Sequence, residues 1–108
     1  MTTLEKMQKN GLRLSYEDIV LLCEKYKIKE LSIFGSSIRD DFHEDSDVDI
    51  LVSYINIRKK THDEFISIET DFDKLLNRKS HITEIEALIN PIRKEDILAE
   101  REIVYVYQ

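Results

Sequence analysis

Two aspartates and a glycine-serine pair are the residues of this sequence whose types and spacing suit phosphate chemistry. Gly35 and Ser36 are followed by ten residues and then by Asp47-Val48-Asp49. The aspartates open an apolar run, and in an extended chain residues two apart share a face. Their carboxylates can therefore bind metal ions together. Mg²⁺ suits such a pair, because it takes one or two protein carboxylates and leaves its other positions to water and phosphates.

The glycine-serine pair supplies the other half of such a site. Gly35 lets the backbone turn sharply after a strand and approach a ligand closely. If residues 36 to 41 begin a helical turn, their free N–H groups face the site, and the Ser36 hydroxyl adds a donor for a phosphate oxygen. The alternative is an acidic turn between two buried strands, in a chain with 22 acidic residues. Two carboxylates on one face of a strand repel each other without a cation, which favours the metal site.

The elements that must position these residues follow from hydrophobic periodicity. The chain of 108 residues has the length of one domain, 1–108, with 1–14 as an N-terminal extension. The order of helix and strand patterns predicts an α+β sandwich, a small mixed β-sheet flanked by helices. The pattern predicts helices over about 16–26, 61–77 and 91–100, strands over 30–34, 46–52 and 81–89, and an aromatic tail, 103–107, that forms an edge strand or a partner interface.

Composition excludes several classes of protein. The formal net charge is -6 and the basic residues are scattered, so we expect no direct binding of nucleic acid. A single cysteine, Cys23, forms no internal disulfide, and the three histidines have no zinc-like spacing. No apolar run has the length of a membrane span and no signal peptide is visible, so we expect a cytoplasmic protein without membrane contact.

The whole pattern resembles the nucleotidyltransferase superfamily related to DNA polymerase β, whose hallmark is Gly-Ser, a fixed spacer and Asp-x-Asp. The small size and several outlying residues look most like its minimal nucleotidyltransferase, or MNT, group. Those residues are Phe34, Arg39, Pro91, Ile97-Leu98, Glu100 and Tyr105. The resemblance implies the polymerase β-like nucleotidyltransferase fold, two Mg²⁺ ions and ATP as the substrate.

The resemblance also implies roles for single residues and for a partner. Asp47 and Asp49 would be catalytic and hold the metals, Gly35 and Ser36 would bind the nucleotide, and Arg39 would contact phosphate or the partner. Members of the MNT group commonly act as antitoxins of HEPN-domain toxins, which they bind and modify by transferring AMP to a tyrosine. The expected function is therefore magnesium-dependent AMP transfer to a HEPN toxin, within a hetero-oligomer.

The third carboxylate that the family usually carries on a later strand is open in this sequence. Glu84 is one candidate and Glu86 is the other, while a strict alignment with the family places Thr83 at the position of the third carboxylate. If none joins the aspartates, the chain is a catalytically silent MNT-fold module that neutralises its partner by binding. Transfer to a small molecule such as an aminoglycoside generally requires a further domain to hold the acceptor.

Overall fold

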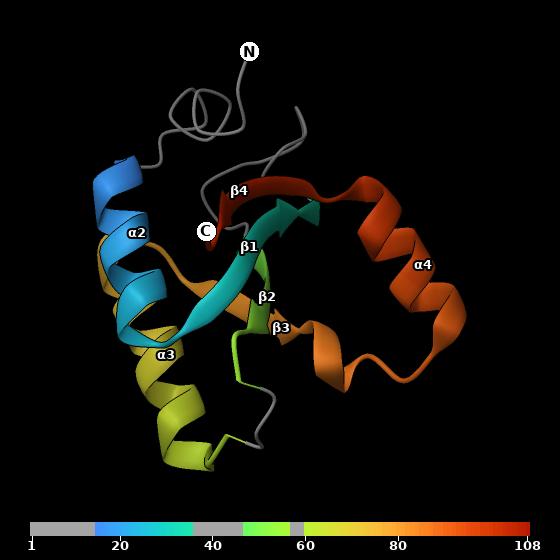
Figure 1. The fold of residues 1–108 in the computed structure, drawn as a ribbon, viewed down its shortest axis with the longest axis horizontal. Helices are drawn as coiled ribbons and strands as arrows, with labels where there is room; N and C mark the ends of the chain where they lie inside the picture. The colour runs from blue at the N-terminus through green and yellow to red at the C-terminus, as the bar shows by residue number, and fades with distance from the viewer. Residues whose placement is uncertain (1–14, 36–46, 57–59) are drawn as a thin grey trace.

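The computed structural model describes residues 15–35, 47–56 and 60–108. Within these ranges the chain forms one four-stranded sheet, in the order β3-β2-β1-β4, with helices on both faces (Figure 1). β1 is antiparallel to β2 and β4, whereas β2 and β3 are parallel, so the sheet is mixed and the predicted α+β class is confirmed. The elements are α2 (Tyr16–Lys25), β1 (Ile28–Phe34), β2 (Val48–Tyr54), α3 (His62–Leu76), β3 (Ser80–Glu84), η2 (Ile85–Ala87), α4 (Pro91–Glu100) and β4 (Glu102–Val106).

Side-chain caps fix where the first two described helices begin. The Ser15 hydroxyl accepts a hydrogen bond from the Asp18 backbone N–H at 3.3 Å, which starts α2. At the start of α3, Thr61 accepts from the Glu64 N–H and the Glu64 carboxylate accepts from the Thr61 N–H, which is a capping box. Each cap satisfies N–H groups that the first helical turn leaves without partners, and both helices start within one residue of the predicted position.

The two faces of the sheet carry different cores. α2 and α3 cover one face, where β2 contributes its alternate residues Val48, Ile50 and Val52, all at most 1% exposed. α4 covers the opposite face, where Leu51 packs with two other buried residues, Phe34 and Ile97. Figure 1 shows α2 and α3 on one side of the sheet and α4 on the other. Because side chains alternate along a strand, Asp49 belongs to the α4 face.

Two segments differ from the sequence prediction in a way that bears on function. β3 ends at Glu84 and is followed by the 3-10 helix η2, so the strand predicted through residue 89 is wrong beyond that point. The aromatic tail forms β4 and pairs with β1 at the edge of the sheet, the first of the two alternatives. Tyr105 is buried there, whereas Tyr107 is 55% exposed. The predicted extension, 1–14, lies outside the described residues.

None of the helices in the described ranges combines the length and the apolar character that crossing a bilayer requires.

Candidate active site

Asp49 stands at the centre of the candidate site, on β2, one of the two inner strands of the sheet. It pairs with Phe34 of β1 and with His81 of β3, and its side chain is 29% exposed. Asp47 lies two residues earlier, just before β2, and is exposed. Val48, between them, is fully buried in the opposite core and holds this end of the strand in place. The two predicted metal ligands therefore come from one anchored strand end.

Gly35 lies directly against the carboxylate of Asp49. Its φ of +72° falls in the left-handed region, which only glycine adopts freely. A Cβ atom added at this position would be 2.3 Å from Oδ2 of Asp49 and 3.2 Å from its Cγ. The sequence predicts a glycine that allows close approach to a ligand, and the structure shows a close approach to Asp49. The glycine therefore helps to set the position of this carboxylate.

Ser36 and Arg39, the other predicted nucleotide-binding residues, lie outside the described residues. Their roles stay predictions.

Glu84 does not reach the aspartates. It pairs with Val52, and directly paired residues share a face, so it lies on the α2 and α3 side of the sheet rather than the Asp49 side. The pKa of Tyr54, which belongs to that core, is raised first by burial and then by the nearby Glu84 carboxylate. Glu84 is thus on the wrong face to act as a third ligand, because the register between β2 and β3 pairs it with Val52.

Glu86, the second candidate, is held elsewhere. It lies in η2, and its Oε1 accepts a hydrogen bond of 3.1 Å from the backbone N–H of Tyr54. Tyr54 ends β2, five residues beyond Asp49, a separation of roughly 16 Å along a strand. The prediction that one of the two glutamates completes the acidic site is therefore not supported by the positions of these side chains.

The residue that the fold brings beside Asp49 is His81, one of the three histidines whose spacing does not suggest a zinc site. His81 is the direct β3 partner of Asp49, and its Nδ1 lies 3.8 Å from Oδ1 of the aspartate, with the side chain 66% exposed. Thr83, the residue that a strict alignment selects, lies two residues beyond His81 on the same face and pairs with Leu51. The sequence held no signal for this choice, because only the pairing register identifies the neighbour of Asp49.

The donor set suits a hard cation held by two carboxylates. Within the described parts of the chain, no group of three or more His, Cys, Asp or Glu side chains could hold a metal ion together. Mg²⁺ requires no such group, since it keeps several waters and binds one or two carboxylates plus substrate phosphates. Asp47 and Asp49 fit that requirement, and their exposure leaves room for water and substrate.

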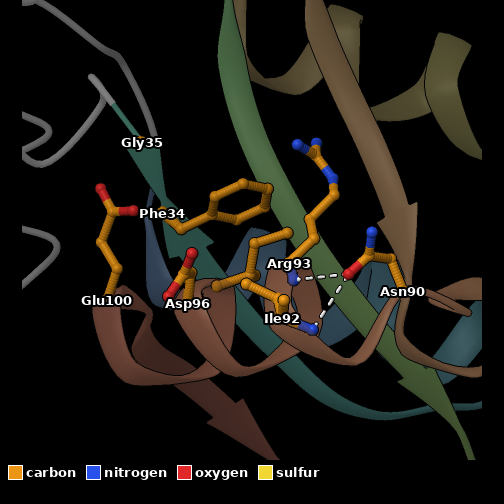
Figure 2. A pocket seen from close by; sticks show the side chains of 8 residues that line it. Phe34, Gly35, Asn90, Ile92, Arg93, Asp96 and Glu100 are labelled. Carbon is orange, nitrogen blue, oxygen red and sulfur yellow. Dashed lines mark hydrogen bonds between the residues drawn. The ribbon is translucent and has the colours of Figure 1, made fainter.

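A cleft of about 450 Å³ adjoins this position on the α4 face. Phe34 and Gly35 line one side, and α4 lines the other with Arg93, Asp96 and Glu100 among its residues (Figure 2). Because Gly35 touches Asp49, the cleft opens beside the carboxylate pair. Its size lies in the range of small-molecule sites.

Comparison with known proteins identifies the family of this chain. The family described as "Nucleotidyltransferase domain" matches residues 20–104. The chain belongs to the nucleotidyltransferase family. A protein adenylyltransferase, MntA of Thermococcus cleftensis, is 35% identical to this nucleotidyltransferase over 85 residues, which cover 79% of this chain and 81% of the relative.

Solved structures share the fold of this nucleotidyltransferase. A toxin-antitoxin crystal structure with AMP-PNP aligns with a TM-score of 0.71 at 15% identity, covering 88% of this chain and 76% of the other. A complex of a tri-AMPylated HEPN toxin from Shewanella oneidensis with its MNT antitoxin aligns with a TM-score of 0.63 at 14% identity, covering 94% and 74%. At these identities the likeness shows the fold, which is that of the minimal nucleotidyltransferases.

Proposed function

We propose that this nucleotidyltransferase transfers AMP from ATP, with Mg²⁺, to a tyrosine hydroxyl of a HEPN-domain toxin and thereby acts as its antitoxin. The observation that carries the proposal is the contact between Gly35 and the Asp49 carboxylate beside an open cleft. The adenylyltransferase name of the Thermococcus relative supports the reaction class. The AMPylated HEPN toxin in the Shewanella complex supports the partner.

In this reaction the chain's own residues bind and orient. Asp47 and Asp49 would hold Mg²⁺, which when bound neutralises charge on the phosphates. Gly35 leaves room for the Asp49 carboxylate, because a side chain at this position would displace it. The tyrosine oxygen forms a bond to the α-phosphorus of ATP, the bond from that phosphorus to the bridging oxygen breaks, and pyrophosphate leaves. The hydroxyl proton is released to solvent.

The experiment that tests the proposal combines the chain, ATP labelled on the α-phosphate, Mg²⁺ and a HEPN protein encoded beside its gene. We expect label on the HEPN protein, lost with EDTA and in the double variant Asp47→Asn, Asp49→Asn. Replacing the tyrosines of the HEPN protein one at a time by phenylalanine locates the acceptor, because the variant without the acceptor hydroxyl loses the label. A wild-type chain that binds the HEPN protein and leaves it unlabelled at millimolar Mg²⁺ and ATP contradicts the proposed reaction.

A second candidate function is a binding module that neutralises the toxin without catalysis. The position of His81 favours it, because this residue stands next to Asp49 while Glu84 and Glu86 are held away. The double asparagine variant separates the two functions. If it protects cells from the toxin as well as wild type does, neutralisation depends on binding alone. If protection is lost while the complex still forms, AMP transfer is required.

A further inference from the structure

Arg93 is a cationic residue of the cleft that neither the glycine-serine motif nor the aspartates account for. It is exposed in the first turn of α4 and lines the same cleft as Gly35. Among the described residues, its guanidinium has no hydrogen bond or ion pair, although Asp96 follows three residues later on the same helix. The Arg93 guanidinium is therefore available to bind a ligand.

The start of α4 fixes where the Arg93 side chain leaves the helix. The Asn90 side chain accepts hydrogen bonds from the backbone N–H groups of Ile92 at 3.0 Å and Arg93 at 3.2 Å. Pro91 occupies the first helical position, where its fixed φ suits a helix. Ile97, one turn on, is 6% exposed and anchors α4 to the sheet. The backbone that carries Arg93 is therefore held on both sides.

The charges of the cleft are separated. Figure 2 shows the Arg93 side chain extending away from Asp96 and Glu100, whose carboxylates lie on the other side of Phe34. Phe34 is 8% exposed and forms an apolar floor between the two ends with Ile97. An anion bound at the arginine end thus avoids the acids.

We propose that Arg93 contacts the outer phosphates of the nucleotide from the α4 side of the cleft, opposite Gly35. This inference rests on the proposed function, which requires a nucleoside triphosphate beside Asp47 and Asp49. Arginine suits the role because its planar guanidinium donates paired hydrogen bonds to phosphate oxygens. The proposal makes α4 a nucleotide-binding element as well as a cover for the sheet.

Binding of AMP-PNP, ADP and AMP to the purified chain, measured by calorimetry with Mg²⁺, tests the inference. We expect Arg93→Ala to weaken AMP-PNP binding by about 10- to 100-fold and AMP binding much less, because charged hydrogen bonds to the outer phosphates are lost. Arg93→Lys keeps the charge and should recover part of the affinity. Lys94→Ala is the matched control, since it removes an equal charge from the next residue, which does not line the cleft.

Each other outcome overturns the inference in a recognisable way. Equal losses for AMP-PNP and AMP place Arg93 at the nucleoside or the first phosphate rather than the outer phosphates. An equal loss in Lys94→Ala shows a general effect of charge. Unchanged binding in Arg93→Ala, with binding still dependent on Asp47 and Asp49, removes the inference and leaves the proposed function standing. A wild-type chain that binds none of the three nucleotides removes both.

Discussion

Gly35→Ala should both strain the backbone and displace the Asp49 carboxylate. At a φ of +72° an alanine costs roughly 1–2 kcal/mol relative to glycine. The new Cβ would lie 2.3 Å from Oδ2 of Asp49, whereas ordinary contacts begin at 3.4 Å, so the carboxylate has to move by about 1 Å. Overpacking of this kind costs about 1–3 kcal/mol in a well-packed site. We therefore expect the free energy of unfolding to fall by about 2–5 kcal/mol in total.

Urea denaturation of the substitution in two backgrounds separates the two contributions. In an Asp49→Ala background the clashing oxygen is gone and the remaining contact, to Cβ at 3.4 Å, is ordinary. Gly35→Ala should then cost only the backbone strain, about 1–2 kcal/mol. Asn77→Ala is a control for strain alone, because Asn77 ends α3 with a φ of +51°. Equal losses from Gly35→Ala in both backgrounds refute the contact with the carboxylate.

The same substitution has a consequence for activity. A displacement of about 1 Å at a reacting centre costs on the order of 100-fold in rate. We expect AMP transfer by Gly35→Ala to fall by that factor at a temperature where circular dichroism shows the variant folded. Asn77→Ala should keep the wild-type rate. A Gly35→Ala chain with wild-type activity means that the position of Asp49 does not limit the reaction.

Three further predictions follow from single side chains. His81→Asp places a third carboxylate beside Asp49 and should raise the rate of AMP transfer at limiting Mg²⁺ by about tenfold. His81→Ala is the control, because an equal rise in its rate would show that the new carboxylate is not the cause. Hydrogen bonds from Lys25 and Tyr26 lower the pKa of Asp71 below its ordinary 3.8, so the stability it contributes is present above pH 3.8 and lost as the pH falls below it. Urea midpoints of Asp71→Asn should therefore lie below wild type at pH 6, and the difference should shrink as the pH falls below 3.8. Burial raises the pKa of Cys23 to about 12. A thiol reagent at pH 8 should therefore label the chain only in denaturant. Labelling of the folded chain as fast as that of an exposed free thiol contradicts this.

Much of the fold could be predicted because it depends on local patterns. The spacing of apolar residues placed α2 and α3 within a residue or two of their observed bounds. Pro91 marked the first residue of α4. Such signals act within a few residues of the chain, where steric preference and backbone hydrogen bonding decide the structure. The end of β3 at Glu84 was missed, because an alternating pattern over Ile85 to Ile89 does not distinguish a strand from a short 3-10 turn.

The sequence alone indicated the nucleotidyltransferase family, because its glycine-serine pair and its Asp47-Val48-Asp49 have the spacing that resembles that family. The tertiary structure decided which side chains stand beside Asp49: it brings Gly35 against the carboxylate, pairs His81 with it, and turns Glu84 to the opposite face. The physical reason is strand register. A shift of one residue in the pairing of β2 with β3 would exchange the two faces of β3, and that register is set by long-range packing of the sheet against its helices.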